Sequence, residues 1–157
     1  MAGQIKNLNI GANKKTQFII DGNENKVIEI DASDTGIIER LNDSLQKIEQ
    51  IQSKWEELGN MFSSHEGEYN IDETSLFSEQ FAECERMMRD VVDDIFDSRV
   101  CDIILGRKSI FSLENGHFMF EVIIDALASE YESNTKVQVQ KLNKRQMSKH
   151  AAKYIGK

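Results

Sequence analysis

Oxygen-bearing side chains recur at alternate positions near the N-terminus, in a spacing that could hold a calcium ion. Positions 1, 3, 5 and 9 of an EF-hand-like register are occupied by Asp21, Asn23, Asn25 and Glu29. The sixth position, where such a loop needs Gly, is Lys26, and the twelfth, where it needs a bidentate Glu, is Ala32. Because both of these positions fail, the segment is interpreted as a hairpin turn and no metal site is predicted.

The other candidates for chemistry are isolated. His117 and Glu121 are four residues apart on a predicted helix, but a metal site needs at least three protein ligands and no third residue completes this pair. Cys84 and Cys101 lack CxxC spacing and are interpreted as small apolar residues on helix faces. Four aspartates are interpreted as a solvated helix face: Asp90, Asp93, Asp94 and Asp97. The chain has no Gly-rich phosphate loop, nucleophile elbow or Cys–His dyad spacing, so we expect no enzymatic activity, no cofactor and no metal.

Charge is distributed unevenly over the 157 residues. Residues 136–157 carry seven Lys or Arg and no Asp or Glu, which leaves 12 basic and 27 acidic residues, a net charge of −15, in residues 1–135. Pro is absent, which excludes polyproline segments and cis-Pro turns. No apolar run approaches the roughly 20 residues of a membrane-spanning helix, and the N-terminus lacks the apolar stretch of a secretory signal. We therefore expect a cytoplasmic protein.

The elements that must position these residues begin with a predicted β-hairpin. Two runs of β-branched and aromatic residues, Phe18–Ile20 and Val27–Ile30, flank a segment that opens with Asp21-Gly22. Gly and Asn accept positive φ angles, which is typical of a hairpin turn. Ile28 and Ile30 share one face of the second strand. Because a lone hairpin is marginal in water, this one must pack on helices or pair with another chain.

A long helix is predicted next, capped by Ser33 or Asp34 and running to about Leu58, with a loop over residues 60–72 after it. Its apolar residues recur at steps of three and four: Ile37, Ile38, Leu41, Leu45, Ile48, Ile51, Trp55 and Leu58. This spacing gives a narrow stripe, close to a heptad seam, that needs a partner helix. Self-association of the chain through the stripe is therefore one open possibility.

More helices follow in the second half of the chain. Their predicted bounds are Asp72 or Thr74 to about Asp97, then residues 100–105 before Gly106, and a third long helix capped by Ser112. The predicted fold class is mainly α (α+β): a small N-terminal β-hairpin packed on a bundle of three long helices plus a short helix, with a basic C-terminal tail.

We expect one domain, residues 17–135. Before it stands a leader of residues 1–16, either flexible or a short strand. After it stands the basic tail, residues 136–157, either a helical extension or disordered. The tail could neutralise nucleic-acid phosphates through Lys141, Lys144, Arg145, Lys149 and Lys153. A nucleic-acid-associated regulator is thus an alternative function, but the charge of −15 on the rest of the chain would repel a duplex, so nucleic acid is not the partner we favour.

The order of parts resembles the tail assembly chaperones of long-tailed phages and prophages of Gram-positive bacteria. Three segments carry the resemblance: FIIDGNENKVIEIDASD, IIERLNDSLQKIEQIQSKWEEL and VVDDIFDSRVCDIILGRKSIFSLENGHFMFEVIIDAL. The ending NKRQMSKHAAKYIGK is similar to the basic ending common in that group. The resemblance covers about residues 17–157, and the long leader before Gln17 departs from it.

The resemblance implies a non-enzymatic role in tail morphogenesis in the bacterial cytoplasm. Such chaperones bind the hydrophobic tape measure protein, keep it soluble and help to recruit the major tail protein. Met-rich and Phe-rich helix faces suit the binding of varied apolar segments, and hydrophobic burial would supply the affinity. The partner-binding residues expected on these faces are Phe77, Phe81, Met88, Phe118, Ile123 and Leu127.

Overall fold

A computed structural model of the chain describes residues 3–11, 15–65, 67–68 and 70–133. Residues 3–11 form neither helix nor strand, and their apolar side chains, Ile5, Leu8 and Ile10, are exposed. The predicted basic tail lies outside the described residues. Among the helices that are described, none is both long enough and apolar enough to cross a membrane.

The predicted hairpin is confirmed. Strands β1 (Thr16–Ile20) and β2 (Asn23–Ile30) pair antiparallel. Both residues of the Asp21-Gly22 turn have positive φ angles, 50° and 72°, which is the geometry of a two-residue type I′ turn. Ile28 and Ile30 are fully buried while Glu29 between them is exposed, so the hairpin packs one face on the helices.

Two antiparallel helices, α1 (Ile37–Ser63) and α2 (Ile71–Phe96), form a long helical hairpin. The predicted cap of α1 is wrong, since no side chain caps it. Asp34 instead accepts a hydrogen bond from the Gly36 N–H at 2.9 Å and pairs with Arg40 at 3.0 Å. The predicted end is also wrong, because α1 continues for more than a turn past Leu58.

The start of α2 was predicted one or more residues too late. Asn70 is its N-cap: the Asn70 side chain accepts from the Glu73 N–H at 2.7 Å, and the Glu73 carboxylate accepts from the Asn70 N–H at 3.3 Å. This reciprocal capping box satisfies two backbone donors that would otherwise lack partners. The helix ends at Phe96, and the φ of 48° at its C-cap, Asp97, turns the chain out of the helix.

The next helix, α3 (Cys101–Leu105), is confirmed, and it ends at Gly106 as predicted. The helix predicted to start after Ser112 begins later. Residues 113–118 form a second small hairpin, β3 (Leu113–Glu114) paired with β4 (His117–Phe118), around an Asn115-Gly116 turn in which both φ angles are positive. A helix then covers residues 119–133.

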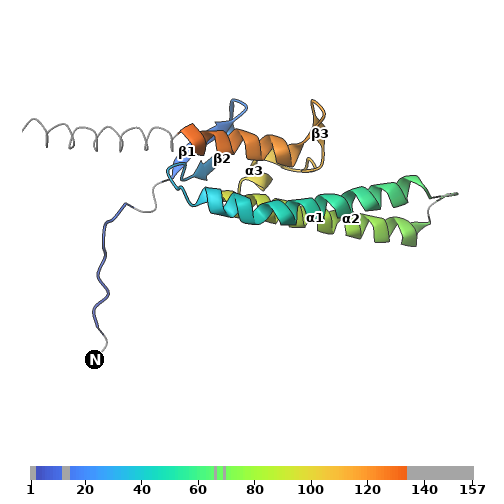
Figure 1. Ribbon diagram of the computed structural model, residues 1–157, viewed down its shortest axis with the longest axis horizontal. Helices are drawn as coiled ribbons and strands as arrows, with labels where there is room; N and C mark the ends of the chain where they lie inside the picture. The colour runs from blue at the N-terminus through green and yellow to red at the C-terminus, as the bar shows by residue number, and fades with distance from the viewer. Residues whose placement is uncertain (1–2, 12–14, 66, 69, 134–157) are drawn as a thin grey trace, which may run out of the picture.

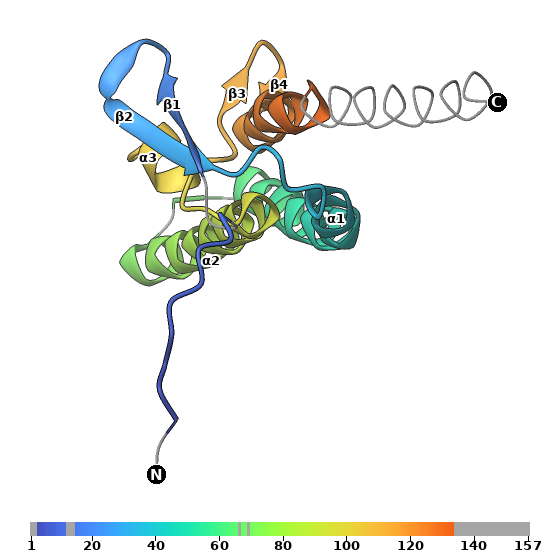
Figure 2. The same cartoon turned by 90° about the vertical axis from the view of Figure 1, so that its left-hand side faces the viewer.

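The elements are arranged in two layers. α1 and α2 make one layer, while the two β-hairpins and helix 119–133 lie over it, with α3 next to β2 (Figures 1 and 2). The core between the layers takes residues from both. Its largest fully buried side chains are Phe96, Phe120, Ile28, Ile30, Met88, Ile95 and Ile110. This second layer covers only part of the helical hairpin, whose far end projects beyond it (Figure 1).

Candidate functional site

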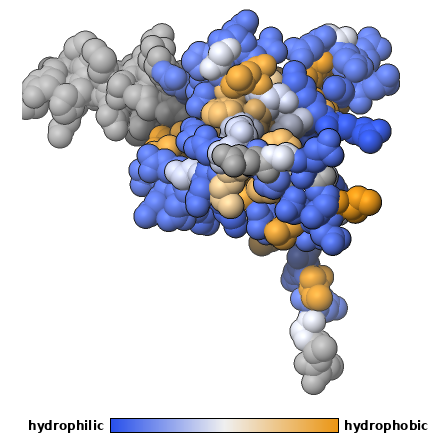
Figure 3. Space-filling view, turned by 90° about the vertical axis from the view of Figure 1, so that its right-hand side faces the viewer, coloured by the Kyte–Doolittle hydropathy of each residue, from blue (hydrophilic) through white to orange (hydrophobic). Residues whose placement is uncertain are grey.

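The projecting end of the helical hairpin exposes apolar side chains that nothing in the described chain covers. We call residues 59–63 of α1 and 71–83 of α2 the hairpin tip, and residues 37–58 and 84–96 the hairpin base. None of the described tip residues is buried, whereas the base contributes nine residues to the core cluster. Met61, Ile71 and Leu76 at the tip are 51%, 84% and 55% exposed. Seen end-on, apolar surface lies among hydrophilic side chains at this end (Figure 3).

Three aromatic rings pack against one another across the tip. Phe62 of α1 meets Phe77 at 5.5 Å and Phe81 at 6.4 Å between ring centroids, both edge to face. Phe62 is nevertheless 45% exposed, and Phe77 and Phe81 are half-buried. These three residues, the tip aromatic cluster, pack well enough to keep the helices together and leave ring surface for a further partner.

The same stripe of α1 is covered at the base. Trp55, seven residues before Phe62, stacks on Phe111 at 4.9 Å and meets Phe118 edge to face at 5.4 Å. Phe118 in turn stacks on Phe120 at 5.3 Å. The difference between the tip and the base is therefore not in the spacing of the helix residues but in whether the second layer reaches them.

A clamp on α2 holds the second layer in place over the base. The Arg89 guanidinium donates to four oxygens: Glu85 Oε2 (3.2 Å), Asp102 Oδ1 (2.8 Å), Gly106 O (3.2 Å) and Lys108 O (2.8 Å). Glu85 also accepts from the Ile110 N–H at 2.8 Å. The Arg89–Glu85 clamp thus fixes the turn that presents Phe111 to Trp55. Its hydrogen bond to Asp102, supported by Arg99, holds the pKa of that carboxyl below its usual value.

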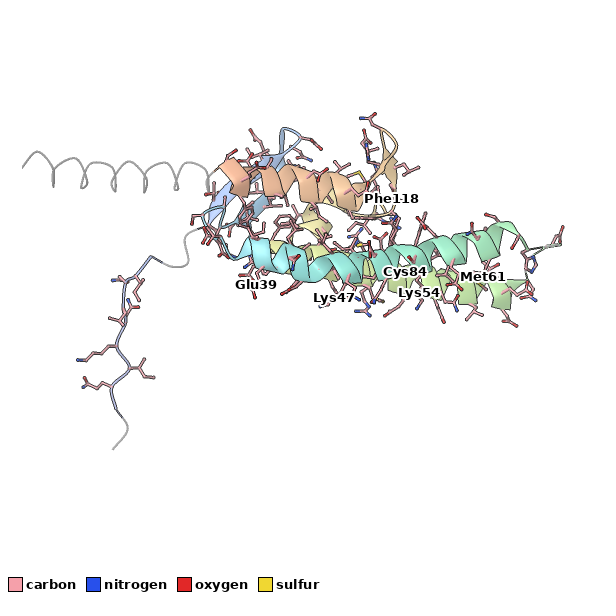
Figure 4. The ribbon with its side chains drawn as sticks, viewed as in Figure 1. Glu39, Lys47, Lys54, Met61, Cys84 and Phe118 are labelled. Atoms are coloured by element: carbon pink, nitrogen blue, oxygen red, sulfur yellow. The ribbon has the colours of Figure 1, made fainter. Side chains whose placement is uncertain are left out.

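The six predicted partner-binding residues fall into three groups. Phe77 and Phe81 lie in the tip aromatic cluster. Phe118 is half-buried among the aromatic rings of the base (Figure 4). Met88, Ile123 and Leu127 are core residues, at most 6% exposed. The chain itself covers these last three residues. Phe77 and Phe81 are the two of the six that lie at the tip, although Phe81 also packs against the edge of the core.

Sequence reasoning missed Phe62 as part of this surface. Residues 60–72 were predicted to form a loop, whereas α1 continues through residue 63. The signal was present, because Phe62 follows Trp55 by seven residues and so continues the heptad-like stripe. The five basic-tail residues predicted as an alternative site, Lys141, Lys144, Arg145, Lys149 and Lys153, lie outside the described residues.

The other residues that the sequence suggested for chemistry cap a helix, are buried, or pair with a neighbouring side chain. Asp93 accepts from the Val100 and Cys101 N–H groups, at 3.0 and 2.9 Å, and so caps α3. Cys84 and Cys101 are buried free thiols, and burial raises the pKa of both. His117 lies in β4 rather than on a helix and its Nδ1 is 3.5 Å from a Glu121 carboxylate oxygen. Within the described ranges, no group of three or more His, Cys, Asp or Glu residues could hold a metal ion.

A polar cavity of about 420 Å³ lies beside the start of α1 and the end of α2. Three carboxylates, Asp31, Asp34 and Asp97, line it together with Tyr131. Burial raises the pKa of the Tyr131 hydroxyl to about 12. The ammonium group of Lys15 also belongs to this wall, where it donates to the Asp97 carbonyl at 3.3 Å. The negative charge here is thus partly balanced by a cation of the chain itself.

The hairpin tip is therefore the candidate site, and the chemistry it offers is the burial of apolar surface. Comparison with protein-family models, with curated proteins and with solved structures finds no match to this chain.

Proposed function

We propose that this chain is a tail assembly chaperone of a long-tailed phage or prophage, and that its hairpin tip binds an apolar helical segment of the tape measure protein. The resemblance of three sequence segments and of the basic ending to that group supports the family. The observation that carries the proposal is the tip aromatic cluster, which is exposed at the end of a hairpin whose base is firmly braced. The role is non-enzymatic and is exercised in the cytoplasm of the bacterial host.

The proposed binding mode follows from the shape of the tip. Two antiparallel helices that present a shared apolar face can accept a third helix whose residues at i, i+3, i+4 and i+7 are apolar. At the base, helix 119–133 already takes this third place, and its Phe120 and Ile123 are buried in the core cluster to which α1 and α2 also contribute. A segment of the tape measure protein would take the equivalent place at the tip, against Phe62, Phe77 and Phe81.

The acidic charge of the chain would support a second role, which is to keep the bound segment soluble. Residues 1–135 carry a net charge of −15, and net charge far from zero opposes association and precipitation. A bound apolar segment would therefore be kept in solution by the acidic surface around it. Recruitment of the major tail protein to the complex belongs to the same proposal.

Co-expression tests the proposal. The full chain, tagged, is produced together with the tape measure protein of the same phage or prophage, and the soluble, co-purifying fraction is measured. We expect the tape measure protein to become soluble and to co-purify. We expect Phe77→Asp with Phe81→Asp to remove this effect, because a charge in the interface must be desolvated.

The matched control is Ile38→Asp with Leu45→Asp, which places the same two charges on α1 side chains that are 64% and 55% exposed and outside the tip. It should bind like the parent chain. Failure of the parent chain to co-purify, or equal loss in the tip variant and the control, would overturn the proposal. Binding of duplex DNA that is strong at low salt and lost at high salt would instead favour the nucleic-acid alternative.

A further inference from the structure

The underside of the helical hairpin, on the side away from the second layer, carries an apolar groove between α1 and α2. Its volume is about 340 Å³. Ile51, buried, and Met87 and Val91, both half-buried, form its floor. Lys47 and Lys54 stand on the α1 rim, and the sticks of both lie on the side of the hairpin away from Phe118 (Figure 4). The groove is separate from the tip aromatic cluster.

The two rims of the groove carry opposite charges. On the α1 rim, neither Lys47 nor Lys54 forms an ion pair with any residue in the described part of the chain. On the α2 rim, Asp90 lines the groove, and Glu83 lies close enough to Lys54 for that ammonium to lower the pKa of its carboxyl, after the larger effect of its hydrogen bond from Arg86. Arg86, which pairs with both acids, offsets only part of their charge.

This arrangement is complementary to itself. Because α1 and α2 are antiparallel, Lys47 lies level with Asp90, and Lys54 lies level with Glu83. A two-fold rotation about an axis along the groove keeps each residue at its level and places α1 of one copy over α2 of the other. The basic rim of each copy then faces the acidic rim of its partner, and the two apolar floors meet.

We propose that a second copy of this chain docks in the groove, forming a four-helix bundle from two helical hairpins. Of the stripe that the sequence offered for self-association, only Ile51 reaches this groove, since Ile48 packs in the core and Trp55 packs against it. A rotation axis parallel to the helices also keeps their direction, so both tips project from the same end of the dimer. Two tips side by side would bind a long helical partner bivalently, which raises avidity. The dimer itself does not depend on the proposed function.

Reversal of the rim charges tests the proposal. The mass of the full chain in solution is measured by light scattering for the parent and for two double variants, Lys47→Glu with Lys54→Glu and Glu83→Lys with Asp90→Lys. We expect the parent to be dimeric and each variant alone to be monomeric, because like charges then face each other across both rims. An equimolar mixture of the two variants should restore a dimer, now of one copy of each, because all four facing pairs are again of opposite sign.

The matched control is Lys6→Glu with Arg107→Glu, which makes the same change in net charge as Lys47→Glu with Lys54→Glu, at exposed positions outside the groove. It should remain dimeric, and thermal unfolding followed by circular dichroism checks the fold of every variant. A monomeric parent at all concentrations, charge variants that stay dimeric, or a folded mixture that stays monomeric would each overturn the proposal. If a variant fails to fold, the parent dimer must still weaken as salt is added, because salt screens the rim charges; a dimer insensitive to salt overturns it.

Discussion

The base and the tip of the helical hairpin are built from the same two helices with the same apolar spacing, yet they have different surroundings. At the base, Trp55 meets aromatic rings of the second layer, and Phe96 is 1% exposed. At the tip, Phe62 meets the rings of Phe77 and Phe81 of α2, and it is 45% exposed. The apolar stripes of α1 and α2 therefore continue beyond the part of the hairpin that the described second layer covers.

The largest effect should come from emptying the covered end. Phe120, 2% exposed, packs against both Phe111 and Phe118. Phe120→Ala should lower the free energy of unfolding by about 3–5 kcal/mol, since it removes a buried ring and leaves a cavity. Urea unfolding measures this, and a loss as small as that of the tip variants below would contradict the idea that the second layer supplies the core.

The next effect should come from releasing the second layer. Arg89→Met keeps the length of the side chain but removes the four hydrogen bonds of the Arg89–Glu85 clamp. The expected loss is about 2–3 kcal/mol, because Glu85 and two backbone carbonyls lose charged donors. Trp55 fluorescence should change as well, since Phe111 is no longer held against its ring. Arg86→Met, on the exposed side of the same helix, is the control and should change neither measurement much.

A smaller effect is expected at the tip. Phe77→Ala should cost about 1 kcal/mol, because burial of a complete side chain contributes roughly 1.5–3 kcal/mol and this ring is only half-buried. The same variant should nevertheless lose most of the co-purification with the tape measure protein. Substitutions at the tip would then reduce mainly binding, and substitutions at the base would reduce mainly stability. A loss of stability equal to that of Phe120→Ala would mean that the tip belongs to the core.

The last effect concerns pH at the covered end and is absent at neutral pH. The pKa of Tyr131 is raised by burial from 10.0 to about 12. A group whose pKa is higher in the folded state contributes its full stability below the unfolded value and loses it as the pH rises, here between pH 10 and 12. Tyr131→Phe keeps the ring against Phe96 and should remove this part of the alkaline loss. Equal slopes of unfolding free energy against pH in parent and variant would contradict the prediction.

Much of the fold could be predicted because it depends on local spacing. The apolar residues of α1 and α2 and the Asp21-Gly22 turn each specify their element without help from distant residues. The β3–β4 hairpin could have been predicted too, since Asn115-Gly116 is the strongest short signal for a type I′ turn. It was missed because Ser112 also suits a helix cap and the apolar spacing after it suits a helix.

The candidate site could be predicted only in part. The spacing of the apolar residues places both Phe81 and Met88 on the buried stripe of α2, about two helical turns apart. In the folded chain Met88 is fully buried in the core, whereas Phe81 is half-buried at its edge. The Arg89–Glu85 clamp was beyond prediction for a similar reason, because its partners lie up to 25 residues away in sequence. Such contacts follow from how elements dock rather than from how each one forms.

One consequence of the capping box at Asn70 concerns the exchange of backbone amide protons with solvent. Because few buried side chains stabilise the tip, its backbone hydrogen bonds can open locally while the rest of the chain stays folded. The capping box limits this fraying by fixing the first turn of α2. Protection should therefore rise along α1 from the tip towards the base. A bound partner would flatten that gradient, so amide exchange along one helix would locate the partner on it.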